Sequence, residues 1–274
     1  MEILEQRMKT YTRVLTIAGS DSSGGAGIQA DLKTISACGC YGMSVITAVT
    51  AQNTQEVAAI HPVPVAVIEA QIGAVLDDIG VDGIKIGMLY SREAVEQVAA
   101  ALGRCGCASI VMDPVMIATS GDALTCGEVA GAMKERLFPQ VRLLTPNIPE
   151  AEILLGCAIG PDLADAARQM AGDFSLSVLM KAGHLQGEKL VDVLYDHDFG
   201  RLTMFENLRV QTENTHGTGC TLSAAIASFL ARGAALPEAV RQAEDYLHGA
   251  IRKGAFYTLG KGHGPVHHFY RFWQ

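Results

Sequence analysis

The chain has 274 residues, of which 49% are hydrophobic and 18% are charged, and its formal net charge is −8. This acidic balance argues against non-specific nucleic-acid binding, although a local site can still be positive. No apolar run approaches the ~20 residues of a membrane helix, and the charged N-terminus lacks the apolar core of an export signal. We therefore expect a cytoplasmic protein with no membrane partner.

Short β-branched runs alternate with longer amphipathic segments through most of the chain. Six strands are expected, several of them apolar on both faces as in the middle of a parallel sheet, at Val14–Ala18, Ser44–Val49, Gly83–Ile86, Ser109–Met112, Arg142–Leu144 and Ser177–Met180. Helices are expected between them, at Ala26–Ala37, Val65–Asp77, Glu93–Leu102, Glu128–Leu137, Pro149–Leu155 and Leu163–Ala171. The pattern then changes to a strand hairpin and two final helices, at Leu190–Tyr195, Leu202–Glu206, Thr218–Ala231 and Pro237–Lys253. This order predicts an α/β fold with a central, mostly parallel sheet covered by helices.

The chain shows no long linker, repeat or low-complexity segment. We therefore expect a single domain over residues 13–274, preceded by an N-terminal extension of residues 1–12. The seven cysteines are an odd number without an export signal, so reduced thiols are expected. Two Cys-x-Cys pairs, which begin at Cys38 and Cys105, lack the Cys-x₂-Cys spacing and the histidines of a zinc site, so no metal is expected there.

Polar or glycine-rich residues follow each of the six expected central strands. They form the segments Gly19–Gly27, Thr50–Thr54, Lys85–Met88, Asp113–Val115, Thr145–Glu150 and Lys181–His184. Ligands of open α/β sheets bind at the carboxyl ends of the strands. One such loop would be weak evidence for a site, whereas six at the same edge of the sheet predict a ligand-binding site.

A Gly-Thr-Gly turn leads directly into the expected helix Thr218–Ala231. Gly217 and Gly219 let the backbone approach an anion without a Cβ in the way. The first helical turn has free N–H groups and the positive end of the dipole, which stabilise a phosphoryl group in transfer. Cys220 lies at this turn, within reach of reacting atoms. The alternative is a glycine-bounded helix start with a buried thiol, because short glycine motifs are weak signals.

Three polar residues, two at strand ends and one on a helix, are candidate ligands, each with a structural alternative. The amide of Gln52 offers a donor and an acceptor that suit an aminopyrimidine edge, or it is ordinary loop polarity. Asp31 faces the pocket from one turn inside a helix, or it is a solvated carboxylate that complements the helix dipole. Lys181 meets a phosphate, or it is simply exposed.

Asp113, Asn147 and Glu150 form a second group of candidates at two strand ends. Their oxygen atoms are of the kind that Mg²⁺ prefers, and Mg²⁺ uses few carboxylates together with waters and substrate phosphates. The alternative is a helix N-cap by Asn147 with Glu150 in the first turn. A capping arrangement and a metal role can coexist.

Taken together, these motifs resemble those of the bacterial hydroxymethylpyrimidine/phosphomethylpyrimidine kinases of thiamine biosynthesis. The resemblance covers nearly everything after Thr12 and rests on the segments Leu15–Thr34, Val49–Thr54, Lys85–Leu89, Asp113–Met116, Thr145–Glu150, Met180–His184, Asn214–Ser223 and Gly260–His268. It implies a ribokinase-like three-layer fold and two ATP-dependent steps. The hydroxymethyl group of 4-amino-5-hydroxymethyl-2-methylpyrimidine would be phosphorylated first, and the monophosphate would then become the pyrophosphate.

The same resemblance implies roles for individual residues. The pyrimidine pocket would be lined by Gly19, Asp31, Gln52 and Met88. ATP and its phosphates would be bound by Asn147, Lys181, Thr215, Thr218 and the turn from Gly217 to Gly219. Mg²⁺ would be held by Asp113 and Glu150. The implied partners are the small pyrimidine and ATP, and a homodimer stays an open alternative.

Cys220 stands where related sugar kinases have an aspartate base. A free thiol has a pKa of ~8.5, which a helix N-terminus lowers, so we expect Cys220 to accept the hydroxyl proton in the first step. Phosphoryl transfer depends mostly on positioning and charge stabilisation, so a weak base suffices. Thr119 stands where many relatives have a lysine, so the chain departs from the family at a contact between a lid and phosphate.

Two alternatives remain. Pyridoxal or pyridoxine kinases of the same superfamily share the cysteine-bearing turn, but the pair Gln52 and Asn53 favours a pyrimidine. A nucleotide-binding regulatory protein could keep the fold and lose catalysis, but the intact Gly-Thr-Gly-Cys turn and the pair Asn147 and Glu150 argue against it.

Overall fold

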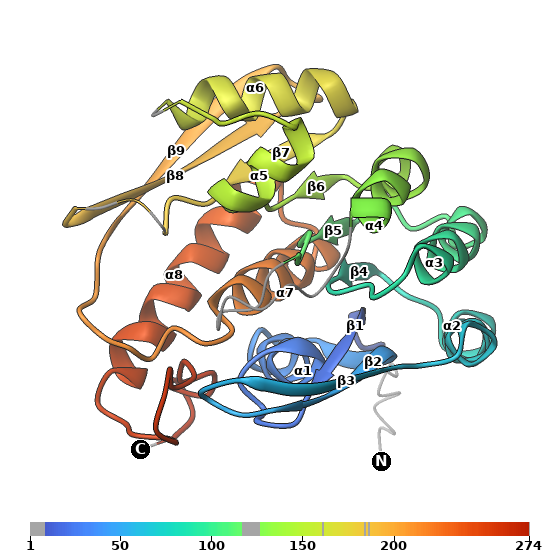
Figure 1. The fold of residues 1–274 in the computed structure, drawn as a ribbon, viewed down its shortest axis with the longest axis horizontal. Helices are drawn as coiled ribbons and strands as arrows, with labels where there is room; N and C mark the ends of the chain where they lie inside the picture. Colours follow the sequence, from blue (N-terminus) through green and yellow to red (C-terminus); the bar gives the residue numbers. More distant parts are fainter. Residues whose placement is uncertain (1–8, 117–126, 161, 184, 186, 274) are drawn as a thin grey trace, which may run out of the picture.

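The computed structural model describes residues 9–116, 127–160, 162–183, 185 and 187–273. A nine-stranded sheet runs through them in the order β3-β2-β1-β4-β5-β6-β7-β8-β9 (Figure 1). The strands are β1 Arg13–Asp21, β2 Tyr41–Gln52, β3 Val57–Pro62, β4 Gly83–Ile86, β5 Ile110–Met112, β6 Leu143–Leu144, β7 Ser177–Met180, β8 Lys189–Asp196 and β9 Arg201–Leu208. The strands from β2 to β7 along this order pair in parallel, and β3, β8 and β9 pair antiparallel at the two edges. The mostly parallel sheet and the β8–β9 hairpin are confirmed.

Helices cover both faces of the sheet and complete the three layers (Figure 1). They are α1 Gly27–Ala37, α2 Val65–Asp78, α3 Arg92–Cys105, α4 Gly127–Ala132, α5 Ile148–Leu155, α6 Leu163–Phe174, α7 Thr218–Ala231 and α8 Leu236–Gly254. Helices α2 to α6 pack in one hydrophobic cluster, and α1, α7 and α8 pack in another. Alternate residues of β1 divide between the two clusters, because successive side chains of a strand point to opposite faces.

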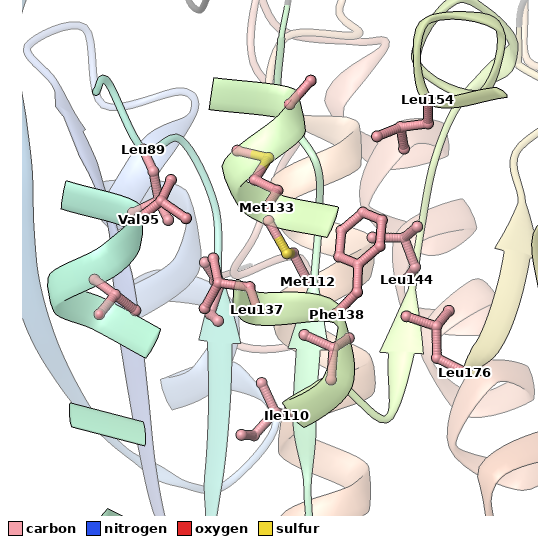
Figure 2. Packing of buried hydrophobic residues seen from close by; sticks show 14 of the residues in the cluster. Leu89, Val95, Ile110, Met112, Met133, Leu137, Phe138, Leu144, Leu154 and Leu176 are labelled. Carbon is pink, nitrogen blue, oxygen red and sulfur yellow. The ribbon is translucent and has the colours of Figure 1, made fainter. Parts of the chain in front are cut away.

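The larger cluster is shown in Figure 2. Side chains of β5 and β6 lie among those of α3 and of the helical segment after α4, the labelled residues being Leu89, Val95, Ile110, Met112, Met133, Leu137, Phe138, Leu144, Leu154 and Leu176. The rings of Phe138 and Phe174 meet edge to face, with centroids 5.0 Å apart. This packing holds β5 and β6 in place, and with them the loops that follow their carboxyl ends.

Helix α7 lies in the other layer and is apolar almost all round, as a fully buried helix must be. Every residue from Thr221 to Leu230 is buried. Its small side chains allow a close approach to the sheet, since a Cβ on Gly83 would lie 2.9 Å from the Cβ of Ala231. The tight packing holds the N-terminus of α7 against the carboxyl ends of the strands.

Two elements differ from the expectations. Strand β3 was not expected, and it pairs with β2 after a turn in which Asn53 Oδ1 accepts hydrogen bonds from the backbone N–H groups of Gln55 and Glu56. The helix expected at Glu128–Leu137 is α4 followed by a π-helical turn, Met133–Leu137, and a 3₁₀ turn, Phe138–Gln140. Pro139 in that last turn has no N–H for a continued α-helix. Among the described residues, no helix has both the length and the hydropathy that a membrane crossing requires.

Candidate active site

A cavity of about 720 Å³ lies at the carboxyl edge of the sheet, where the loops after the parallel strands meet the N-terminus of α7. Its size is in the range of small-molecule sites. All of the predicted site residues except Asp31 line it, namely Gly19, Gln52, Met88, Asp113, Asn147, Glu150, Lys181, Thr215, Gly217, Thr218, Gly219 and Cys220. The structure thus brings together residues from six separate strand ends and from the turn that begins α7.

One end of the cavity is formed by Gly19, Gln52 and Met88. A Cβ on Gly19 would lie 2.5 Å from Met88 Cε, so glycine leaves the room that the methionine side chain fills. The hydroxyl group of Thr47 donates to the carbonyl oxygen of Met88 at 2.7 Å, and that of Thr50 donates to Gln52 Oε1 at 3.1 Å. These contacts hold the methionine backbone and keep the glutamine side chain beside Thr50 at the cavity wall.

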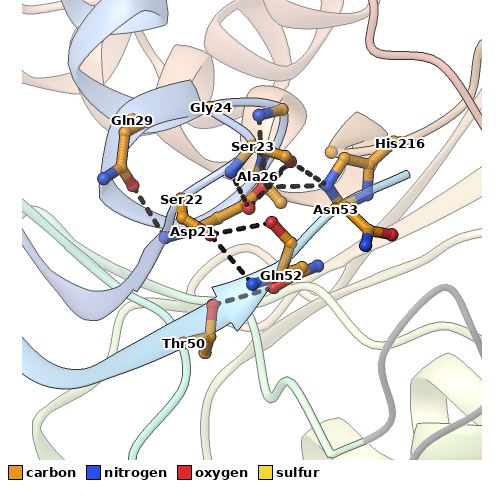
Figure 3. Close-up of polar contacts among 12 residues, drawn as sticks. Asp21, Ser22, Ser23, Gly24, Ala26, Gln29, Thr50, Gln52, Asn53 and His216 are labelled. Atoms are coloured by element: carbon orange, nitrogen blue, oxygen red, sulfur yellow. Dashed lines mark hydrogen bonds and ion pairs between the residues drawn. The ribbon is translucent and has the colours of Figure 1, made fainter. Parts of the chain in front are cut away.

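Asp21 organises the loop after β1, as Figure 3 shows. Its carboxylate accepts hydrogen bonds from the N–H groups of Ser23, Gly25 and Ala26 at 2.8, 3.1 and 2.8 Å. It also pairs with His216 Nε2 at 2.8 Å. Burial acts to raise the pKa of Asp21, but the bonds from His216, Ser23 and Ala26 outweigh it and lower the pKa to about 2. The sequence interpretation missed both members of this pair.

The turn before α7 packs on the same loop. Gly217 has φ +80°, and a Cβ on it would overlap the carbonyl oxygen of Gly25, so both its conformation and the close approach require glycine. Gly217 is the N-cap of α7, and no side chain caps that helix. Backbone N–H groups of the first helical turn therefore remain for an anion in the cavity.

Asp31 lies beneath the cavity and does not line it. It is fully buried, accepts a hydrogen bond from the Thr16 hydroxyl group at 2.6 Å, and forms an ion pair with Lys85 Nζ at 2.8 Å. Burial acts against the ammonium of Lys85, but the Asp31 carboxylate outweighs it and raises the pKa of Lys85. The alternative of a solvated carboxylate is therefore wrong, and contact of Asp31 with a pyrimidine stays a prediction. Lys85 lines the cavity in its stead.

Asp113, Lys181 and Glu150 form a charged group at the next strand ends. Lys181 Nζ lies 2.7 Å from Asp113 Oδ1 and 3.9 Å from Glu150 Oε2. Asn147 and Glu150 form a capping box at the start of α5, with both side chain to backbone bonds at 2.9 Å. Burial, with Asp113 adding to it, raises the pKa of Glu150 to about 7, although Lys181 opposes the rise.

These carboxyl groups are the donors that a metal ion could use. The part of the chain that the structure describes contains no cluster of three or more His, Cys, Asp or Glu side chains arranged for a metal. Asp113 and Glu150 supply carboxylate oxygens, the donor type that Mg²⁺ takes in small number together with water and phosphate oxygens.

Cys220 lies in the first turn of α7 and is half-buried at the cavity wall. Burial raises the pKa of its thiol to about 11, with the charges of Asp31 and Asp113 adding to the rise and Lys85 opposing it. The expected lowering of this pKa by the helix N-terminus is therefore wrong. At neutral pH the thiol keeps its proton.

The far end of the cavity lies between the β8–β9 hairpin and α8, and sequence reasoning missed it. Apolar side chains cover most of it, namely Leu190, Leu208, Val210, Leu247 and Ile251. A polar group, Asp192, Asn207 and Glu244, joins them. Glu244 gave a signal, because it interrupts the apolar face of the amphipathic helix that includes Val240, Ala243 and Leu247.

Two residues named in the sequence interpretation lie outside the described residues. They are Thr119, which replaces the lysine of many relatives, and His184, which ends one of the polar segments. Of the cysteines, those described are all free, namely Cys38, Cys40, Cys105, Cys107, Cys157 and Cys220.

Comparison with known proteins identifies similar chains over nearly the whole length. The profile of the family described as phosphomethylpyrimidine kinase matches residues 21–267. A hydroxymethylpyrimidine/phosphomethylpyrimidine kinase of Rhizobium meliloti is 49% identical, over 95% of this chain and 98% of that protein. A thiamine biosynthesis bifunctional protein of Geobacter sulfurreducens is 48% identical, over 93% of this chain and 52% of that protein.

Solved structures of two kinds share the fold. The crystal structure of Clostridium difficile phosphomethylpyrimidine kinase is 43% identical with a TM-score of 0.77, covering 87% of this chain and 99% of that one. The ADP complex of Bacillus subtilis pyridoxal kinase is 36% identical with a TM-score of 0.87, covering 96% of this chain and 99% of that one.

Proposed function

Because the chain belongs to the phosphomethylpyrimidine kinase family, we propose that the cavity at the carboxyl edge of its sheet performs two successive phosphorylations. The enzyme uses ATP to phosphorylate hydroxymethylpyrimidine to the monophosphate and the monophosphate to the pyrophosphate, in thiamine diphosphate biosynthesis. The observation that carries the proposal is that a single cavity has two chemically different ends. One end is small and apolar and carries the amide of Gln52. The adjoining end is cationic and lies at the N-terminus of α7, which no side chain caps.

We assign the pyrimidine to the end formed by Gly19, Gln52 and Met88. The thioether of Met88 offers an apolar surface for the ring, and the Gln52 amide can pair with a ring nitrogen and its exocyclic amine. The Thr50 hydroxyl group, 3.1 Å from Gln52 Oε1, holds this side chain at the cavity wall. A pyridine ring lacks that pair of groups, so the same wall discriminates against pyridoxal.

We assign the ATP phosphates to the opposite wall. Lys181 and Asn147 supply a cation and an amide, and Thr215 and Thr218 supply hydroxyl groups beside the free N–H groups of α7. In phosphoryl transfer the charge spreads over the oxygens of the transferred group, so fixed donors that face them lower the barrier. Lys85, held by Asp31 beneath the cavity, adds a second fixed positive charge.

We also propose Mg²⁺ as the cofactor, held beside Asp113 and Glu150. Asp113 and Glu150 would hold the ion, which would supply positive charge to offset that of the phosphates. Removal of divalent ions with EDTA should abolish turnover, and added Mg²⁺ should restore it. Full turnover in EDTA would contradict this assignment.

Cys220 is proposed to contact the acceptor oxygen in its protonated form. With a pKa of about 11, the thiol is a poor proton acceptor at neutral pH. Placement of the hydroxyl group and charge stabilisation then supply most of the acceleration, as is usual for phosphoryl transfer. In the second step the acceptor is already an anionic phosphate, so a base matters less.

The substitution Gln52→Ala tests the pyrimidine assignment. Leaving the pyrimidine groups unpaired costs about 1–3 kcal/mol, roughly 5- to 150-fold in binding, so the KM for hydroxymethylpyrimidine should rise while the KM for ATP stays nearly constant. Gln55→Ala is the matched control, since Gln55 is exposed and lies outside this cavity. Equal losses for both substrates would overturn the assignment. A wild-type preference for pyridoxal in the same assay would favour a pyridoxal kinase.

A further inference from the structure

Three polar side chains meet in the wall of the cavity between the β8–β9 hairpin and α8. Asp192 comes from β8, Asn207 from β9 and Glu244 from α8. All three line the cavity, and Glu244 is only 5% exposed. Most of their neighbours on this wall are apolar, with Arg209 and His248 as the charged or titratable exceptions. Water therefore gives the buried Glu244 little solvation.

The two carboxyl groups lie within hydrogen-bonding reach of each other. Asp192 Oδ1 accepts from the backbone N–H of Ala182 at 2.7 Å, and Glu244 Oε2 accepts from Asn207 Nδ2 at 3.0 Å. Glu244 Oε1 is buried and has no partner among the described donors. Two neighbouring carboxyl groups repel each other when both are ionised, so one of them tends to keep its proton. A proton on Glu244 Oε1 would give that atom a hydrogen bond, donated to Asp192.

From this geometry we propose that Asp192 and Glu244 hold one proton between them and act as a positioning pair for the ATP phosphates. The inference rests on the proposed function, which places those phosphates beside Lys181. Asp192 holds the N–H of Ala182, the residue directly after Lys181. The shared proton links the end of β7 to α8 through the contact between Asp192 and Glu244. It also removes one negative charge from the cavity that must accept the ATP phosphates.

The charges around the cavity support this assignment. Asp21, Asp31 and Asp113 each pair with a basic side chain, His216, Lys85 and Lys181 respectively. Within the described part of the chain, neither Asp192 nor Glu244 forms an ion pair. A proton then does for this pair what a lysine does for Asp31 and for Asp113.

The surrounding groups favour retention of that proton. Burial raises the pKa of both carboxyl groups, and Asp192 raises that of Glu244 further. Lys181 from the end of β7 and Arg241 on α8 oppose the rise, while Asp245 on α8 adds to it. His248, also on α8, has a lowered pKa because of its burial and Arg252, so it adds little positive charge at neutral pH.

The test is the pH dependence of nucleotide binding. Isothermal titration with a non-hydrolysable ATP analogue and Mg²⁺ would be run between pH 6.5 and 9 on wild type, Glu244→Gln and Asp245→Asn. Wild type should lose about tenfold in affinity across this range, the ratio that one pKa unit of coupling gives. Glu244→Gln should lose much less, because its Nε2–H replaces the shared proton and its Oε1 still accepts from Asn207. Asp245→Asn removes an exposed charge that adds to the rise in the pKa of Glu244, so it should keep the wild-type loss with a midpoint moved slightly to lower pH.

The melting temperature provides a readout that needs no nucleotide. A carboxyl group with a raised pKa in the folded state binds more protons there than in the unfolded chain, so stability falls as pH rises through that window. The melting temperature of Glu244→Gln should therefore exceed that of wild type at pH 8, and the gap should close near pH 4. Asp192→Asn, whose amide can donate to Glu244, should behave alike and substitutes if Glu244→Gln does not fold.

The outcomes separate the inference from the proposed function. Parallel pH profiles for wild type and Glu244→Gln, or a profile of Asp245→Asn that matches Glu244→Gln, would overturn the shared proton. Failure of wild type to bind the analogue at any pH would instead overturn the proposed function.

Discussion

Three carboxyl groups in or beneath the cavity, those of Asp21, Asp31 and Asp113, each pair with a basic side chain within the protein. Lys85 is the instructive case, because its strand is otherwise apolar on both faces and its ammonium is fully buried. A lysine in such a strand must have an acidic partner, so the sequence Gly83–Ile86 predicts one without saying which. Asp31 supplies it from α1, and neither sequence interpretation of Asp31 considered this role.

The pKa of Cys220 could not be read from the sequence either. The helix N-terminus was visible, but the burial that outweighs it depends on how α7 packs against β4 and β5. Dipole effects are typically below 1 kcal/mol at a helix end, whereas desolvation of a thiolate shifts a pKa by several units. Residue type and motif therefore predicted the position of the thiol correctly and its protonation wrongly.

The substitution Cys220→Ser tests the protonated thiol. Since Cys220 has a pKa of about 11, we expect the rate of the first phosphorylation to fall by about tenfold or less, well below the ~10²–10⁴ of an effective general base. Steady-state rates on hydroxymethylpyrimidine and on its monophosphate check this. A thousandfold loss on the alcohol alone would show that Cys220 is the base after all.

The low pKa of Asp21 leads to a prediction about the stability of the protein in acid. Its folded pKa of about 2 lies below the ~3.9 of an unfolded aspartate. The stabilisation is therefore complete above about pH 5 and is lost as pH falls toward 2, and it amounts to about 2.5 kcal/mol at neutral pH. Asp21→Asn should lower the free energy of unfolding by roughly this amount at pH 7 and by almost nothing near pH 2.

Urea titrations at several pH values measure this difference. Asp198→Asn in the exposed β8–β9 turn is the control and should change little at any pH. A deficit of Asp21→Asn that stayed constant down to pH 2 would show that the residue stabilises the loop by packing rather than by charge.

At the scale of elements, hydrophobic periodicity was sufficient to locate the segments with a clear apolar pattern. Strands β1, β2 and β7 and helices α7 and α8 lie where the pattern placed them, because each has a long apolar stripe or run. Strand β3 lacks such a stripe and is largely exposed at the sheet edge. It forms because β2 offers a free edge after the Asn53 turn, which is a tertiary cause.

The turn before α7 gives a prediction at this scale. Gly217→Ala forces a side chain both into a left-handed conformation and into the backbone of Gly25. We expect a loss of stability well above the ~1 kcal/mol of conformation alone, together with near-complete loss of turnover. Gly106→Ala is the matched control, since Gly106 has φ +62° at a helix end but meets nothing within 4 Å.

Thermal unfolding and turnover of the two variants decide the matter. Gly106→Ala should show a small loss of stability and full activity. If Gly217→Ala were as stable and as active as Gly106→Ala, the close contact between the turn and the β1 loop would not be needed for the site.

At the scale of the whole molecule, the cavity exists because the parallel strands end at one edge and α7 points its N-terminus at that edge (Figure 1). The sequence predicted this edge from the polar residues after each strand. It could not predict the wall between the β8–β9 hairpin and α8, because no motif there marks which faces meet. Membership in the kinase family adds the reaction that this arrangement performs.

The most direct test is mass spectrometry of the products formed from hydroxymethylpyrimidine, ATP and Mg²⁺ by the purified protein. The account predicts the monophosphate first and the pyrophosphate after longer incubation with fresh ATP, with two ATP consumed for each pyrophosphate. Accumulation of the monophosphate alone would remove the second activity, and absence of both products would contradict the assignment of this cavity as a pyrimidine kinase site.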